Sequence, residues 1–136
     1  MDQIIGDLIK KHKTNCPFTI AENRKIKVVH DNLGNSTRGL YYTKLRRRYI
    51  VIHNKLCPNW QRLICAHELG HDVLHSGISH FWLDEHSFFN VGKFERQANT
   101  FAVHLLAHGD MLQPGESVSD LLRRNYIPEE MQKFYF

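Results

Sequence analysis

The chain has 136 residues, and its 42% hydrophobic and 11% aromatic residues are sufficient for one packed core. The formal charge of +4 is modest, and no apolar run approaches the ~20 residues that span a bilayer, so the composition argues against a membrane protein. Three cysteines without a C-x-x-C pair, and an N-terminus without a secretory pattern, indicate a cytoplasmic location. We expect a single domain over residues 1–136.

The first half of the chain is predicted to form one helix and three strands. Apolar residues recur at helical spacing over residues 2–13, which predicts an amphipathic helix that ends near Pro17. The predicted strands, which are rich in alternating, aromatic or β-branched residues, cover residues 25–30, 39–43 and 49–53. The polar breaks at residues 32–35 and 44–48 suit connections between antiparallel neighbours. The sequence therefore predicts an α+β fold with a small three-stranded antiparallel sheet.

The densest basic run lies between two of these strands and comprises Lys44, Arg46, Arg47 and Arg48. We interpret this run as a solvated hairpin turn, and the alternative is a contact site for DNA or for an acidic partner. Because the positive charge is not otherwise concentrated, direct binding of nucleic acid is not expected.

The segment over residues 58–75 contains the motif H-E-x-x-H, formed by His67, Glu68 and His71. On a helix the two histidines lie one turn apart on the same side, so both imidazoles reach one metal ion. Glu68 lies beside them, too far round to be a natural third ligand but within reach of a water molecule at the metal. This spacing is typical of zinc peptidases, in which the glutamate is the general base.

Apolar residues surround this helix on nearly all sides, which predicts that the helix is buried. Two imidazoles and a carboxylate in such a place are costly unless a divalent cation compensates them. We therefore favour a zinc site over the alternative of core histidines that are satisfied by hydrogen bonds.

A catalytic zinc ion needs a third protein ligand and an open position. A second helix is predicted over residues 94–108, where Glu95 begins an apolar stripe and two alanines allow a close approach to the first helix. Glu95 is therefore the favoured third ligand. The alternatives lie in a predicted loop over residues 76–90, and they are His80, Asp84, Glu85 and His86. His75 lies a further turn along the ligand face and is expected to line the cleft or to orient a ligand.

Three sequence segments together resemble the ImmA/IrrE family of metallopeptidases. They are YIVI at residues 49–52, RLICAHELGH at residues 62–71 followed by Leu74 and His75, and ERQANTFA at residues 95–102. The resemblance implies a short helix and a small sheet ahead of a helical, zincin-like core that carries H-E-x-x-H on its active-site helix. It also implies Zn2+ as the cofactor and Glu95 as its glutamate ligand.

The C-terminal tail also resembles the closing helices of the family. Ser117 and Asp120 predict the start of a helix, and Pro128 is suited to the first turn of another.

The family resemblance implies a biological role as well. Members are often encoded beside helix-turn-helix repressors of prophages or other mobile elements, and they relieve repression by cutting those repressors. We therefore expect a zinc-dependent endopeptidase whose substrate is such a repressor. Glu68 is expected to take a proton from the attacking water and to pass it to the leaving amine. The alternative is a non-catalytic, zinc-containing antirepressor or a DNA-associated regulator that acts by binding.

Overall fold

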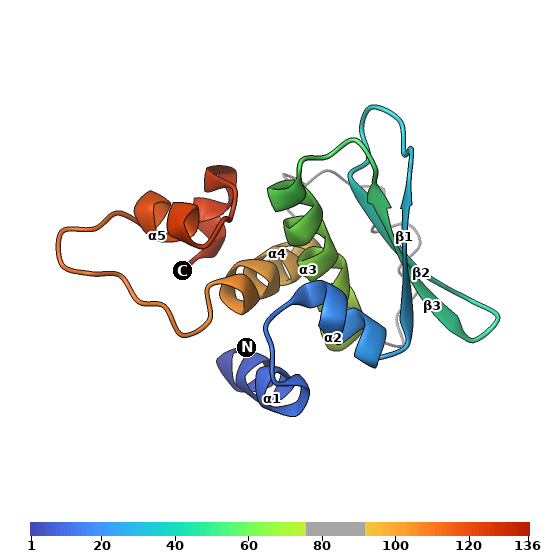
Figure 1. Cartoon of the computed structure of the whole chain (residues 1–136), viewed down its shortest axis with the longest axis horizontal. Helices are drawn as coiled ribbons and strands as arrows, with labels where there is room; N and C mark the ends of the chain where they lie inside the picture. Colours follow the sequence, from blue (N-terminus) through green and yellow to red (C-terminus); the bar gives the residue numbers. More distant parts are fainter. Residues whose placement is uncertain (76–91) are drawn as a thin grey trace.

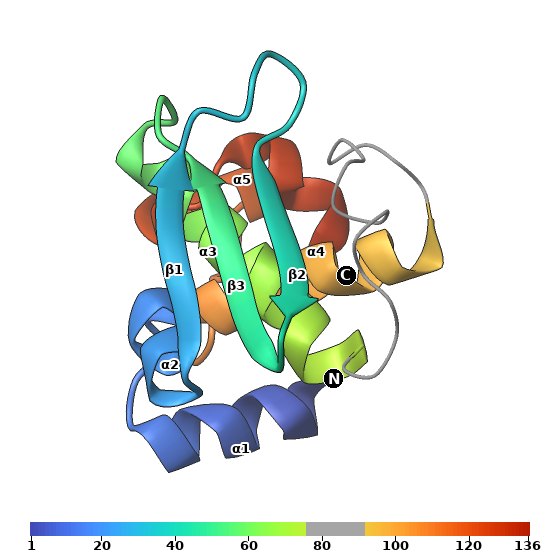
Figure 2. The same ribbon diagram turned by 90° about the vertical axis from the view of Figure 1, so that its right-hand side faces the viewer.

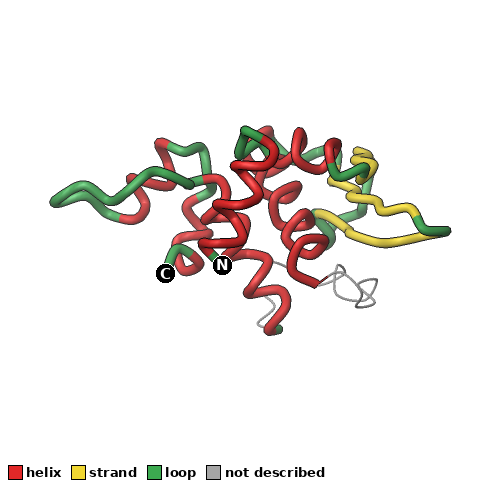
Figure 3. Tube along the Cα trace, turned by 90° about the horizontal axis from the view of Figure 1, so that it is seen from below, coloured by secondary structure: helices red, strands yellow, loops and turns green. Residues whose placement is uncertain are grey.

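The computed structural model describes residues 1–75 and 92–136, which form helices packed on one face of a small sheet. In chain order the elements are α1 (Asp2–His12), α2 (Pro17–Asn23), β1 (Ile26–Asp31), β2 (Gly39–Lys44), β3 (Arg47–His53), α3 (Pro58–His75), α4 (Lys93–Leu106), α5 (Val118–Arg124) and the 3-10 helix η1 (Glu129–Phe134). Figure 1 and Figure 2 show the helices on a single side of the sheet, with α3 directly against it. In Figure 3 the strands gather at one end of the molecule and the helices fill the rest.

The sheet is mixed, not purely antiparallel. Its strand order is β1-β3-β2, in which β3 is antiparallel to β2 but parallel to β1. The predicted hairpin of β2 and β3 is confirmed, whereas the prediction that β1 and β2 are antiparallel neighbours in a purely antiparallel sheet is wrong. Residues 32–38 instead carry the chain over the end of β3 to the far edge of the sheet (Figure 2).

Hydrophobicity explains why β3 takes the central position. Ile50, Val51 and Ile52 of β3 are all buried, whereas β1 and β2 each end in exposed polar residues. A central strand is flanked on both sides, so the most apolar strand gains the most from that position. The crossing from β1 to β2 spans two strand spacings, about 10 Å, which a connection of this length covers easily.

The basic run forms the turn of the β2–β3 hairpin. Leu45 and Arg46 occupy the turn with φ angles of 51° and 66°, which are the positive values that a two-residue type I′ turn requires. Lys44, Arg46 and Arg47 are exposed there, in agreement with the interpretation of a solvated turn. Arg48 differs from them because its side chain folds back onto α3.

Helix α3 is buried along most of its length, as its apolar surroundings predict. Every residue from Leu63 to Asp72 is buried, and the helix packs against β2, β3, α2 and α4. Leu63, Leu69 and Ile64 contribute fully buried side chains to the core. Each fully buried side chain of this kind contributes about 1.5–3 kcal/mol, so packing alone is sufficient to hold α3 in its place.

A buried charge cluster centred on Asp72 fastens α3 to the sheet. One carboxylate oxygen of Asp72 accepts hydrogen bonds from the Tyr41 hydroxyl at 2.5 Å and from Arg48 at 2.9 Å. The other oxygen accepts from Arg24 at 2.8 Å. Burial, reinforced by the hydrogen bond to Asp72, raises the pKa of the Tyr41 hydroxyl, which therefore stays protonated and donates. Asp72 is fully buried, and its charge is balanced by donors from three other segments of the chain.

Three further elements can be compared with the predictions from the sequence. Helix α2 was not predicted, and it begins with Pro17 in its first turn, where a missing N–H costs nothing. Helix α5 begins with the predicted capping box, in which the Ser117 side chain accepts from the Asp120 N–H and Asp120 accepts in return. Pro128, which was expected in the first turn of a helix, occupies the N-cap position directly before η1 and makes no side-chain capping hydrogen bond.

None of the helices in the described ranges is both long and apolar enough to cross a bilayer.

Candidate metal centre

Three potential metal ligands converge between α3 and α4. His67 and His71 lie on α3, and Glu95 lies in the first turn of α4. The Nε2 atom of His67 is 3.0 Å from one Glu95 carboxylate oxygen, and the Nε2 atom of His71 is 3.0 Å from the other. One ligand atom from each residue lies within 4.8 Å of the others, and all three residues are buried. Within residues 1–75 and 92–136 no other group of such side chains is close enough to share an ion.

Small residues bring the two helices close enough for this convergence. A Cβ atom at Gly70 would lie 2.9 Å from the Phe101 ring of α4, so only glycine fits at this point of α3. Ala98 and Ala102 of α4 are fully buried. The short side chains let α4 approach α3 until the carboxylate of Glu95 reaches the two imidazoles.

A hydrogen bond to Asn99 fixes the tautomer of His67. The Nδ1 atom of His67 lies 2.7 Å from the amide oxygen of Asn99, which only accepts hydrogen bonds. Nδ1 must therefore carry the proton, and in the neutral ring Nε2 carries a lone pair. Nε2 is also the nitrogen of His67 that lies 3.0 Å from the carboxylate of Glu95.

A longer chain of hydrogen bonds fixes the tautomer of His71. The amide oxygen of Gln97 lies 2.8 Å from Nε2 of His75, so this nitrogen donates and Nδ1 of a neutral His75 accepts. Burial lowers the pKa of His75, which favours the neutral ring. Nδ1 of His71 lies 3.0 Å from Nδ1 of His75 and must donate to it. Nε2 of His71 is then left with its lone pair towards Glu95.

The charge and burial of this cluster suit a divalent cation. Burial lowers the pKa of His71 to about 4, so its ring is neutral at neutral pH. The two Nε2 atoms and the Glu95 carboxylate therefore face one another, and a divalent cation placed between them would contact all three groups. Ligand atoms on one tetrahedral zinc ion lie about 3.3 Å apart, close to the separations seen here.

Glu68 lies on the side of α3 that faces the start of β2. Its side chain is buried, and its Oε2 atom would be 3.0 Å from a Cβ atom placed on Gly39. Within the described residues β2 pairs with β3 alone and forms an edge of the sheet. The carboxylate of Glu68 therefore lies between the ligand-bearing helix and an edge strand.

The structure places some of the residues singled out in the sequence and not others. His75 contacts His71 and lies beside the Phe94 ring, with 4.5 Å between the ring centroids. The alternative ligands from the predicted loop, His80, Asp84, Glu85 and His86, lie outside the described residues. Sequence reasoning missed Asn99 and Gln97. Asn99 was detectable, because it lies four residues after Glu95 and so shares its helical face.

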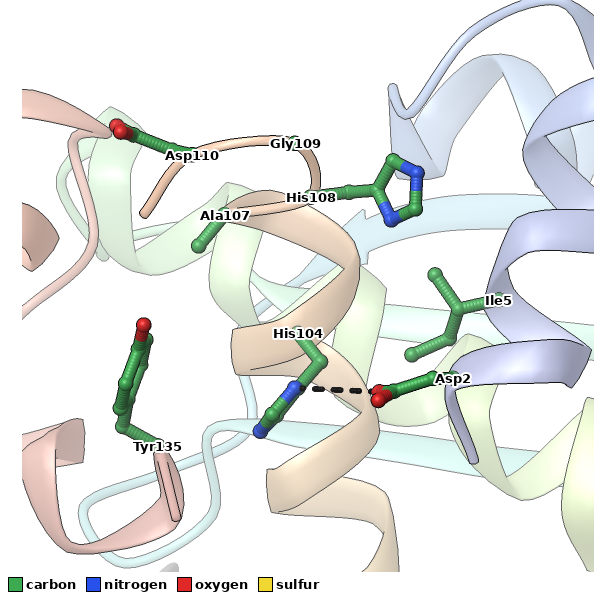
Figure 4. A pocket seen from close by; sticks show the side chains of 8 residues that line it. All are labelled: Asp2, Ile5, His104, Ala107, His108, Gly109, Asp110 and Tyr135. Atoms are coloured by element: carbon green, nitrogen blue, oxygen red, sulfur yellow. Dashed lines mark ion pairs between the residues drawn. The ribbon is translucent and has the colours of Figure 1, made fainter. Parts of the chain in front are cut away.

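A cavity of about 310 Å3 lies near the C-terminal end of α4, away from Glu95 (Figure 4). His104 lines it, 3.7 Å from Asp2 of α1 and stacked on Tyr135. His104 lies nine positions after Glu95, which corresponds to about 13 Å along the helix axis. Among the described residues, no group of three potential ligand atoms gathers around the histidines of this cavity.

The comparisons with known proteins agree with this arrangement. A family model, Peptidase_M78, described as the IrrE N-terminal-like domain, matches residues 21–124, a range that includes every candidate ligand named above. "Uncharacterized immunity region protein 2" of Bacillus phage phi105 is 41% identical over 128 residues, which cover 91% of this chain and 81% of that protein. Metallopeptidase ImmA of Bacillus subtilis is 32% identical over 108 residues, which cover 79% of this chain and 63% of ImmA. The chain therefore belongs to the ImmA/IrrE family of metallopeptidases.

Proposed function

We propose that this protein is a zinc-dependent endopeptidase in which His67, His71 and Glu95 hold the metal and Glu68 is the general base. The observation that carries the proposal is the convergence of two oriented imidazole nitrogens and a carboxylate, each within 3.0 Å of its neighbour, in a buried site. Hydrogen bonds at the opposite ring nitrogens turn both Nε2 atoms toward the carboxylate of Glu95, and this arrangement of two imidazoles and one carboxylate fits a cation-binding role.

The residues of the chain have separate tasks in this proposal. Asn99 and the His75–Gln97 pair hold the two imidazoles in the tautomers that bind a metal. When bound, a divalent cation supplies Lewis acidity, which lowers the pKa of a water molecule and polarises the peptide carbonyl. The Glu68 carboxylate takes the proton from the attacking water and returns it to the leaving nitrogen.

We propose that the substrate binds along β2. An edge strand offers unpaired N–H and C=O groups to which an extended peptide adds as a further strand. The first residue of β2, Gly39, is the residue that lies against Glu68. A peptide paired with β2 would thus pass beside the general base.

The proposed substrate is a helix-turn-helix repressor of a prophage or mobile element. One relative is named as a phage immunity region protein and another as a metallopeptidase, and these two names support a substrate that belongs to phage immunity. The net charge of +4 disfavours association with the basic, DNA-reading face of a repressor. The cut is therefore expected in the linker or dimerisation region, where it would separate DNA binding from dimerisation.

Co-expression of the protein with the repressor encoded beside it tests this proposal. The repressor should be shortened at one main site, and Glu68→Gln should retain zinc while it lowers the cleavage rate by about 10²–10⁴-fold. Loss of zinc in Glu68→Gln would contradict the separation of base and ligands. A repressor that stays intact while its operator occupancy falls would instead identify a non-catalytic antirepressor.

A further inference from the structure

Gly39 is the residue of β2 that comes closest to the proposed general base. A Cβ atom at this position would lie 3.0 Å from Oε2 of Glu68, tighter than ordinary van der Waals contact. It would also overlap with Cγ2 of Ile64 and lie 3.3 Å from the carbonyl oxygen of Val51. Gly39 has no positive φ angle, so lack of space, and not backbone conformation, excludes a side chain here.

The two side chains that meet Gly39 lie on one face of α3. Ile64 and Glu68 are four residues apart, so they are neighbours on the helix surface. Both are buried, and α3 packs directly against β2. A methyl group on Gly39 would therefore push on a packing residue and on the Glu68 carboxylate at once.

We propose that Gly39 is a positioning residue for the general base, because its bare Cα lets the carboxylate of Glu68 lie against the edge strand. This inference rests on the proposed function, in which Glu68 transfers the proton. With any side chain at this position, Glu68 moves away from β2, and the carboxylate no longer lies between the edge strand and the metal ligands. A contact of 3.0 Å requires the carboxylate to move by a few tenths of an ångström, and since a displacement of about 1 Å lowers rates by about 10²-fold, we expect a loss of about threefold to tenfold.

The packing effect and the catalytic effect of a methyl group can be separated. Ile64→Leu removes Cγ2, the atom with which the methyl group would overlap, and keeps the side-chain volume, so it is well tolerated in a core. In this background the methyl group of Gly39→Ala meets Glu68 and, at 3.3 Å, the carbonyl oxygen of Val51, but not the branched methyl of Ile64. Gly6→Ala is the matched control, since a Cβ atom there has no neighbour within 4 Å.

The experiment compares four zinc-loaded proteins: wild type, Ile64→Leu, Gly39→Ala/Ile64→Leu and Gly6→Ala. The readouts are zinc content, melting temperature, kcat and KM for repressor cleavage, and affinity for acetohydroxamate. A hydroxamate chelates the metal and hydrogen-bonds to the neighbouring carboxylate, so it reports the position of Glu68 without any turnover.

We expect the double variant to match Ile64→Leu in zinc content and melting temperature. Its kcat should fall by about threefold to tenfold with KM nearly unchanged, and its hydroxamate affinity should fall by about threefold to tenfold, because the hydrogen bond to the carboxylate is strained but not lost. Gly6→Ala should match wild type in kcat and in hydroxamate affinity.

Equal kcat and equal hydroxamate affinity in the double variant and in Ile64→Leu would overturn the positioning role and leave Gly39 as a packing residue. A wild-type protein that binds zinc and hydroxamate but cuts no repressor would overturn the proposed substrate alone. The hydroxamate affinities would then still decide the role of Gly39.

Discussion

Two buried polar clusters lie at consecutive positions of α3, one around His71 and the other around Asp72, about 100° apart around the helix axis. The Asp72 carboxylate is surrounded by donors, since Arg24, Arg48 and Tyr41 all direct N–H or O–H groups at it. At His71 the opposite holds, because its Nε2 lone pair and the lone pair of His67 face the carboxylate of Glu95. Both clusters are buried and both involve α3. They differ in whether other side chains of the protein supply hydrogen-bond donors to the buried carboxylate.

This difference separates a structural charge from a binding site. A buried carboxylate that is paired with cationic side chains of the same protein helps to hold the fold together, and it does not need to bind an ion from solution. A buried carboxylate matched only by lone pairs costs stability until a cation arrives. The comparison predicts that substitutions in the two clusters act on different quantities, the folding equilibrium in one case and the metal equilibrium in the other.

The largest effect is expected for Asp72→Ala. It removes the acceptor of the hydrogen bonds from Arg24, Arg48 and Tyr41 and leaves the two partly exposed arginines facing each other, which together cost about 3–5 kcal/mol. Urea denaturation of the metal-free protein measures this loss. Asp7→Ala, at an exposed position, is the control and should change stability by less than about 0.5 kcal/mol. A loss below about 1 kcal/mol for Asp72→Ala would remove the distinction between the clusters.

Glu95→Gln should act almost wholly on metal binding. Zinc at 100–1,000 times its Kd stabilises a binding-competent protein by about 2.7–4.1 kcal/mol, and the variant should lose most of this gain. Without metal the variant should be at least as stable as wild type, because it removes an uncompensated buried charge. Melting curves with zinc and with a chelator measure both quantities. Glu130→Gln, at an exposed glutamate, should retain the full zinc effect.

Acidification should weaken the metal-free protein through His71. Burial lowers the pKa of His71 from 6.5 to about 4, so between these values the unfolded state binds a proton that the folded state does not. Stability is therefore lost as the pH falls through this window, by up to about 3 kcal/mol. Urea midpoints at several pH values in a chelator measure the slope. His71→Asn should flatten it, whereas His30→Gln, at an exposed position, should not; equal slopes in both would contradict the assignment.

The smallest effects are expected where side chains act through the ligands. Asn99→Ala and Gln97→Ala remove the groups that orient His67 and His75, and such losses lower metal affinity by about 10–100-fold. Competition with a zinc chelator measures the change. Thr100→Ala on the same helix is the control. Unchanged affinity in both variants would show that the tautomers are set by other contacts.

Local patterns in the sequence predicted much of the fold. The helix periodicities and the capping box of Ser117 and Asp120 depend on residues within a few positions of each other, and the structure contains these elements. The parallel pairing of β1 with β3 was not predictable in this way. It depends on which strand is buried between the other two, and that is a property of the whole sheet.

The candidate site also has features that local sequence patterns predict and features that depend on contacts between distant segments. The spacing of His67, Glu68 and His71 is local, so the order of the residues is enough to predict two imidazoles on one face of a helix with a carboxylate beside them. Contacts between distant segments, which local spacing does not predict, bring Glu95 to both imidazoles, two arginines to Asp72, and Gly39 to Glu68. A buried polar group takes its partner from whichever segment packs against it. Helical spacing restricts the face on which a side chain lies, but packing between distant segments selects what it touches.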